Sequence, residues 1–219
     1  MPNITLPIYS KGEKLFNSIT HIVGGAFSIA GLILGLIFGY KNGLDAWGMI
    51  SIVLYGVGVT VMYTMSSIYH FLNRNAAKKV FRVFDHCAIY LAIAGTYSPL
   101  CLIALNRPLG FWLLGIVWGL SIIGITANSI DMTKKSVKIG SMISYILIGW
   151  FVILAIKPLI NAAGIAFFMW ILAGGLAYTV GAILYLFGKE HKWFHSIFHL
   201  FVLLGSVLQY IGIFFYLIL

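Results

Sequence analysis

Long runs of apolar residues, separated by short polar stretches, constrain this chain more than any other feature. The hydrocarbon core of a bilayer is about 30 Å thick, so a helix needs about 20 apolar residues to cross it. Backbone polar groups inside lipid must be hydrogen-bonded within their own segment, which favours helices. The runs therefore predict an all-α integral membrane protein, a bundle of seven transmembrane helices. The expected spans are residues 20–40, 46–69, 87–105, 109–130, 139–156, 162–187 and 194–219.

The composition excludes a soluble globular protein. Of 219 residues, 61% are hydrophobic and only 9% are charged, which leaves too little polar surface to face water on all sides. Seven spans with short connections use nearly the whole chain, so we expect one domain, residues 1–219, in which residues 1–18 form a short cytoplasmic segment. The first apolar run is too long for a signal-peptide core and lacks a small-residue cleavage site, so we interpret it as a retained span.

Basic residues are distributed unequally between the two ends of the predicted helices. Only Lys41, Arg107 and Lys157 lie at one end, and the other eleven Lys and Arg residues lie at the opposite end. Because Lys and Arg accumulate in cytoplasmic loops, we expect a cytoplasmic N-terminus and an extracytoplasmic C-terminus in the plasma membrane. The asymmetry also explains the net charge of +9 without a nucleic-acid partner. The eleven are Lys11, Lys14, Arg74, Lys78, Lys79, Arg82, Lys134, Lys135, Lys138, Lys189 and Lys192.

Six ionisable side chains lie at the edges of the spans. Placing an ionisable group in a membrane helix is energetically unfavourable, so such residues indicate candidate functional sites. In the topology above, each is expected near the cytoplasmic end of its helix. Four helices would then present imidazole or carboxylate groups at one depth in the membrane. They are His21 at the start of the first span, His70 at the end of the second, Asp85 and His86 at the start of the third, and His195 and His199 at the start of the seventh.

Three of these histidines have the spacing and placement of metal ligands. His195 and His199 are four residues apart, so they share one helix face and can bind the same ion. A third ligand must come from another helix, and His70 is expected at the same membrane depth. Three neutral histidines leave one tetrahedral position open for water, which is typical of catalytic Zn²⁺ rather than of a closed structural site. Histidine ligands also suit iron, copper or nickel.

The histidine pair lacks the internal glutamate of the metalloprotease motif HExxH, so a general base must come from elsewhere in the chain. Asp85 is the one acid expected at the edge of a span and at the depth of the histidines. We expect it to take a proton from the water that the metal activates. Ser66 lies one turn before His70, and we expect it to hold that water or to stabilise an oxyanion.

Other interpretations of the polar residues remain open. A histidine near a helix end can be an interfacial group or a partner of the helix dipole. Glu13, Asn17 and His21 recur every four residues, and this stripe is either a second shell or gate of the site or a plain amphipathic entry turn. His86 points about 100° away from Asp85 and is expected to be a neighbour of the site rather than a ligand.

Four segments together resemble the hemolysin III branch of the progestin and adipoQ receptor (PAQR) family. They are "GEKLFNSITH", "SSIYH", "FDHCAIYLAIAGTYSP" and "HKWFHSIFH", in this order along nearly the whole chain. The wider CREST group, which includes alkaline ceramidases, has a serine and a histidine four residues apart on the second helix. It has an aspartate on the third helix and a histidine pair on the seventh. Here these residues are Ser66, His70, Asp85, His195 and His199, without departure from the pattern.

The resemblance implies a Zn²⁺ held by the three histidines and a water held by the aspartate. In the adiponectin receptor branch it implies hydrolysis of lipid amides, whereas the bacterial branch takes its name from haemolysis. The leading hypothesis is a zinc-dependent membrane hydrolase whose substrate is a membrane lipid amide or ester, with no soluble partner implied. The alternatives are a pore-forming, haemolytic membrane protein with a structural zinc, and a membrane receptor or metal sensor.

Overall fold

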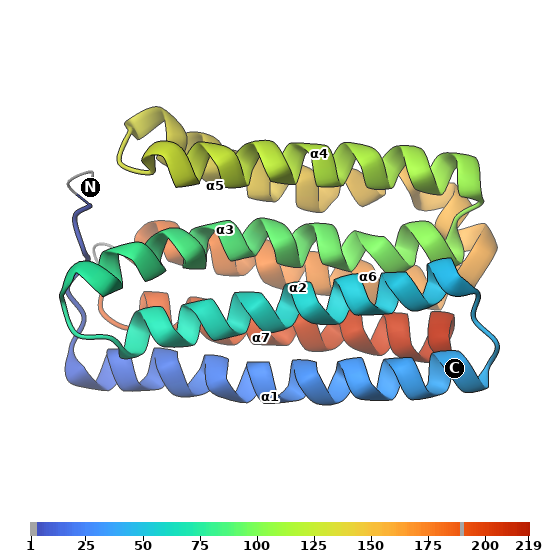
Figure 1. Ribbon diagram of the computed structural model, residues 1–219, viewed down its shortest axis with the longest axis horizontal. Helices are drawn as coiled ribbons and strands as arrows, with labels where there is room; N and C mark the ends of the chain where they lie inside the picture. Colours follow the sequence, from blue (N-terminus) through green and yellow to red (C-terminus); the bar gives the residue numbers. More distant parts are fainter. Residues whose placement is uncertain (1–3, 189–190) are drawn as a thin grey trace.

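The computed structural model describes residues 4–188 and 191–219, and in this part of the chain the fold is all-α. The helices lie side by side along one long axis and form a bundle (Figure 1). Lys189, one of the basic residues counted above, lies outside the described residues. The helices are α1 (Lys11–Lys41), α2 (Ala46–Phe71), α3 (Ala76–Pro99), α4 (Arg107–Asp131), α5 (Lys135–Gly149), α6 (Ile156–Phe187) and α7 (Phe194–Ile213). Two π-helices, η1 (Leu100–Ala104) and η3 (Phe214–Ile218), extend α3 and α7, and the 3₁₀-helix η2 (Trp150–Ala155) joins α5 to α6.

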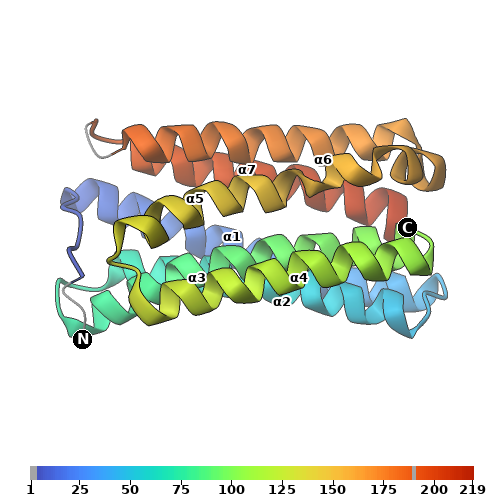
Figure 2. The same cartoon turned by 90° about the horizontal axis from the view of Figure 1, so that it is seen from above.

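Six helical stretches of the described chain are long and apolar enough to cross a membrane. One of them, residues 135–187, has 53 residues because it combines α5, η2 and α6. Inside it, Gly164 has φ 84° and ψ 164°, which no helix accommodates. Figure 2 shows that α5 runs toward one end of the bundle and that α6 returns from it. The structure therefore confirms a multi-pass bundle of apolar helices. The expected number of seven spans is reached only if residues 135–187 cross the membrane twice.

Two helices begin earlier than the apolar runs predict. The side chains of Ser10 and Asn75 accept hydrogen bonds from backbone amides in the first turns of α1 and α3, so each helix begins in a polar stretch. The expectation that His21 begins the first helix, and that Asp85 and His86 begin the third, is therefore wrong. All three lie between two and three turns inside their helices.

α2 and α3 approach each other closely at two glycines. A Cβ atom on Gly58 would lie 2.6 Å from the carbonyl oxygen of Leu91, and one on Gly95 would lie 2.7 Å from that of Leu54. Small residues allow such close backbone approach between helices in a membrane. This contact fixes how the end of α2, with His70, lies relative to α3.

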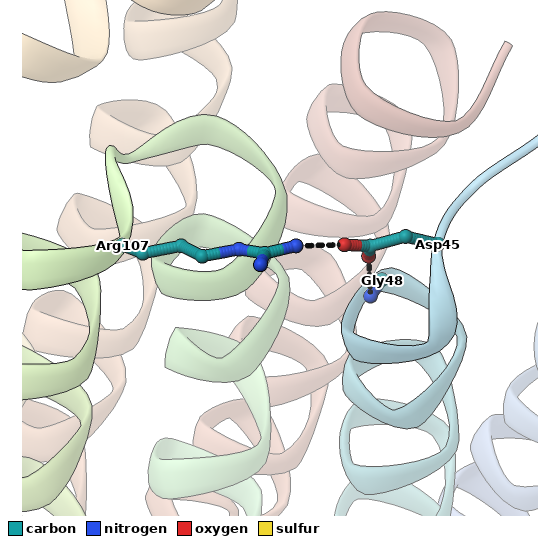
Figure 3. Close-up of polar contacts among 3 residues, drawn as sticks. All are labelled: Asp45, Gly48 and Arg107. Atoms are coloured by element: carbon teal, nitrogen blue, oxygen red, sulfur yellow. Dashed lines mark hydrogen bonds and ion pairs between the residues drawn. The ribbon is translucent and has the colours of Figure 1, made fainter.

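The carboxylate of Asp45 links two connections at one end of the bundle (Figure 3). It accepts a hydrogen bond from the amide of Gly48 at 2.9 Å, which caps α2, and it pairs with the guanidinium of Arg107. The Gly48 hydrogen bond, assisted by the charge of Arg107, holds the pKa of Asp45 below its usual range. At least half of each charged side chain is exposed, so solvent screens the ion pair and the cap is the larger contribution.

We expect Asp45→Ala to lower the thermal midpoint of the detergent-solubilised protein at pH 7, because α2 loses its cap. Asp45→Asn keeps a capping side chain and should lose less, and Arg107→Gln should change the midpoint least. As the pH falls below about 4, the usual pKa of aspartate, and then through the lowered pKa of Asp45, this stabilisation is lost. The difference between wild type and Asp45→Ala should therefore shrink in acid. Equal losses for Asp45→Asn and Asp45→Ala at pH 7 would contradict the capping role.

Candidate metal centre

The end of α2 and the start of α7 bring three histidines together at one end of the bundle. His70 is the penultimate residue of α2, and His195 and His199 lie in the first two turns of α7. Their exposed fractions are 1%, 8% and 1%. An imidazole enclosed to this degree in an apolar bundle requires a partner for its ring nitrogens, because an unpaired buried polar group is costly.

The three rings point their Nε2 atoms at one another. The Nε2 of His195 lies 3.3 Å from that of His70 and 3.1 Å from that of His199. One nitrogen from each of the three rings lies within 4.8 Å of the chosen nitrogen of each other ring. Bonds of about 2.0 to 2.1 Å to a tetrahedral ion place ligand nitrogens about 3.3 Å apart. The donor set and its spacing therefore fit a shared metal ion, as expected from the sequence.

Asn17 of α1 contacts the outer face of the His70 ring. Its Nδ2 lies 3.5 Å from the Nδ1 of His70, and its Oδ1 has no hydrogen-bond partner within the described chain. A neutral imidazole that binds a metal through Nε2 carries its proton on Nδ1, so it requires an acceptor there. Exchanging the amide oxygen and nitrogen of Asn17, which are nearly equivalent in shape, supplies that acceptor. Asn17 is thus placed to orient His70.

His21 lies inside the bundle and packs against the same cluster without joining the group of three nitrogens. Its ring centroid is 3.9 Å from that of His199 and 5.1 Å from that of Tyr63. In the described part of the chain, neither of its ring nitrogens has a hydrogen-bond partner. A buried ring in this position is a neighbour of the cluster and does not face solvent at an entry turn.

Glu13 joins the start of α1 to the start of α7. Its Oε2 accepts a hydrogen bond from the backbone amide of Ser10 at 2.9 Å, and its own amide donates to the Ser10 hydroxyl oxygen at 3.2 Å, which together form the capping box of α1. The Ser10 hydroxyl also donates to Oε2 at 2.7 Å. Its Oε1 accepts a hydrogen bond from the backbone amide of Trp193 at 2.9 Å. Trp193 has φ 68°, a left-handed conformation that is uncommon for a bulky residue and needs such support. Because His195 follows two residues later, Glu13 fixes where α7 places its histidines.

Lys78 is a residue of this region that sequence reasoning missed. Its ammonium is buried and donates to the backbone carbonyls of His70 and Leu72 at 3.3 and 2.9 Å. It also lies 4.9 Å from the ring centroid of Tyr69. A cation at these carbonyls stabilises the C-terminus of α2, which carries His70. In the sequence Lys78 is one of four basic residues in a connection, and nothing distinguishes it from a lysine that faces water.

Tyr9 is the second residue that sequence reasoning missed. Its ring stacks on that of His195, with centroids 4.9 Å apart and planes 26° apart, and lies 5.6 Å from that of His70. Burial raises the pKa of the Tyr9 hydroxyl well above its usual range, so the ring stays neutral. An aromatic residue just before a helix carries no signal for such a contact.

Asp85 and Ser66 are neighbours of each other and lie outside the group of three nitrogens, and Ser66 is one turn before His70 on α2. Asp85 is half-buried on α3 and has the hydroxyl of Ser66, on α2, as its neighbour. His86 also lies outside the group, and its backbone carbonyl accepts a hydrogen bond from the hydroxyl of Tyr145 at 2.8 Å. The structure thus brings together three histidines as one donor set and a serine and an aspartate as adjacent polar groups.

This chain is similar to known proteins over most of its length. The family described as haemolysin-III related matches residues 9–210. "Hemolysin-3" of Bacillus cereus is 42% identical over 205 residues, which cover 93% of this chain and 91% of the relative. "Hemolysin-3 homolog" of Bacillus subtilis (strain 168) is 37% identical over 204 residues, 93% and 94% of the two chains. Human "Monocyte to macrophage differentiation factor" is 24% identical over 212 residues, 94% and 84%.

Replacing Asn17 should weaken metal binding without removing a ligand. We expect Asn17→Leu to lower metal affinity about 10- to 100-fold, the usual effect of losing an outer hydrogen-bond partner of a ligating histidine. Asn17→Asp retains an oxygen acceptor and should keep most of the affinity. Competition titration with a chromophoric chelator measures both. Equal affinity in Asn17→Leu and wild type would show that Asn17 does not orient His70.

Proposed function

The chain belongs to the haemolysin-III related family, and from this premise we propose that it is a zinc-dependent membrane hydrolase that cleaves an amide or ester bond of a lipid. The observation that carries the proposal is the convergence of three buried imidazoles, in which the Nε2 of His195 lies 3.3 Å from that of His70 and 3.1 Å from that of His199. Three histidine ligands leave a metal with an open position, the arrangement of catalytic sites.

We also propose the membrane orientation. The chain crosses the plasma membrane seven times, with α5 and α6 as separate crossings, the N-terminus in the cytoplasm and the C-terminus outside. This is supported by the opposite directions of α5 and α6 and, among the described residues, by ten Lys and Arg residues at one end of the helices against three at the other. The histidine cluster then lies near the cytoplasmic side.

We propose zinc as the metal, because three histidines with one open position are typical of catalytic Zn²⁺, although imidazole also suits iron, copper and nickel. His70, His195 and His199 would hold it through neutral imidazole nitrogens, a ligand type that suits Zn²⁺ and leaves one position free. When bound, Zn²⁺ supplies Lewis acidity, which polarises a carbonyl and lowers the pKa of water to about 7. Side chains of the protein carry out the proton transfers and stabilise the negative oxygen.

Asp85 serves as the general base and then as the general acid. It accepts a proton from the attacking water and returns it to the leaving nitrogen or oxygen of the lipid, so the reaction consumes one water and releases an acid and an amine or alcohol. The hydroxyl of Ser66 donates a hydrogen bond to the negative oxygen that develops on the attacked carbonyl. The substrate enters laterally from the bilayer, because the outward faces of the helices are apolar.

A second candidate function rests on the names of the Bacillus relatives. Both are called hemolysin-3 or its homolog, so a cytolytic protein with a structural metal is the alternative. That protein would release dye from lipid vesicles, and the release would not depend on Asp85.

Asp85→Asn should abolish turnover while the metal stays bound. We expect a decrease of about 10²- to 10⁴-fold, the usual contribution of a general base, and about 10²-fold for Ser66→Ala. The assay follows release of fatty acid from fluorescent ceramides, N-acyl amines and ester lipids in micelles, with metal content measured on the same samples. Asp131→Asn, at the end of α4, is the matched control and should keep wild-type turnover.

If Asp85→Asn kept full activity on every lipid that the wild type cleaves, Asp85 would not be the base. If no lipid were cleaved and both the wild type and Asp85→Asn released dye from vesicles, the cytolytic function would replace the hydrolase.

A further inference from the structure

The chain before α1 crosses the end of the bundle at which the three histidines lie. Figures 1 and 2 both show it running from the start of α1 toward the connection between α2 and α3. We call residues 4–10 the N-terminal strap. Ile4 is buried, and the guanidinium groups of Arg82 and Arg74 donate hydrogen bonds to the backbone carbonyls of Thr5 and Pro7. Two arginines of another part of the chain therefore hold the strap across this end.

The other end of the strap is fixed to both α1 and α7. Ser10 forms the capping box with Glu13, and the same carboxylate accepts the amide hydrogen bond of Trp193. The ring of Trp193 packs across α1, with its centroid 6.1 Å from that of Phe16. The strap is thus anchored on two opposite sides of the histidine cluster and lies outside the helices.

Tyr9 is the part of the strap that meets the cluster. Its ring covers the face of His195 in a stacked geometry and lies near His70. The three histidines are almost completely enclosed, and at this end of the bundle the Tyr9 ring is one of the groups that enclose His195 and His70.

We propose that the N-terminal strap is a lid over the metal centre, with Tyr9 as its cover, which lifts to let a metal ion enter or leave from the aqueous phase at this end. The proposal rests on the metal centre of the proposed function, and it adds a control on access to that centre. Ser10 stays fixed to α1 as the hinge of the strap. The contacts that must break are the burial of Ile4, two arginine hydrogen bonds and one ring stack, each of modest strength, so the lid opens without unfolding the bundle.

The test measures the rates at which the full-length protein in micelles takes up and loses Zn²⁺ or Co²⁺. Tyr9→Ala removes the cover, and the pair Arg74→Gln with Arg82→Gln removes the anchors. Each should accelerate both uptake and chelator-driven loss, by a few-fold to about tenfold, with a smaller change in equilibrium affinity. Tyr9→Phe keeps the stacked ring and should retain wild-type rates. Tyr40→Ala is the matched control, because Tyr40 is 80% exposed near the other end of α1.

Unchanged rates in Tyr9→Ala and in the arginine pair would overturn the lid. Faster loss with unchanged uptake would also overturn it, because Tyr9 would then only support His195. If the wild type bound neither metal, the metal centre itself would fail and the lid with it. If the wild type bound metal and the strap variants took it up and lost it at wild-type rates, the lid would be rejected and the metal centre would stand.

Discussion

The rest of the structure depends on the convergence of three imidazoles inside an apolar bundle. Burying polar groups in a membrane protein is costly unless they bind a partner, and these rings turn their Nε2 atoms toward one another at 3.1 and 3.3 Å. A shared cation satisfies all three nitrogens at once. The three nitrogens can share one ion only if the end of α2 lies against the start of α7. The packing of these two helices with α1 and α3 holds them in that position.

The residues around the cluster fix the positions of its ligands by different means. Asn17 contacts the far nitrogen of His70, and Lys78 binds the carbonyls at the end of the helix that carries it. Glu13 fixes the left-handed turn at Trp193, from which α7 begins. Such neighbours restrict the rings of the cluster, and here the side chains that do so come from two other helices, α1 and α3.

The sequence predicted a bundle of apolar helices and the three histidines that meet in it, for two physical reasons. Apolar runs of bilayer length predict spanning helices, and the spacing of His195 and His199 places both on one helix face. The expected topology then placed His70 at the same depth, and in the structure His70 meets the other two histidines. The starts of α1 and α3 were misplaced, because their first turns are polar and are set by caps rather than by hydrophobicity.

The contacts of Lys78, Tyr9 and Trp193 could not be predicted, since each joins residues whose proximity depends on how separate segments pack. Glu13 and Trp193 are an example, because they lie 180 positions apart in the chain. Helical periodicity says which face of one helix a residue occupies, and it says nothing of the ring or carbonyl that another segment brings to it. The reversal between α5 and α6 was expected from the number of apolar runs, and the glycine at which the helix breaks was not.

The most direct test of the account is X-ray absorption spectroscopy on the purified wild-type protein, together with its elemental analysis. The account predicts one Zn²⁺ per chain, with three imidazole nitrogens at about 2.0 to 2.1 Å and one light atom in the remaining position. In His195→Ala, the stoichiometric metal should be lost while the helical content measured by circular dichroism stays the same. Absence of metal from the wild type after incubation with Zn²⁺, or retention of the same spectrum in His195→Ala, would contradict it.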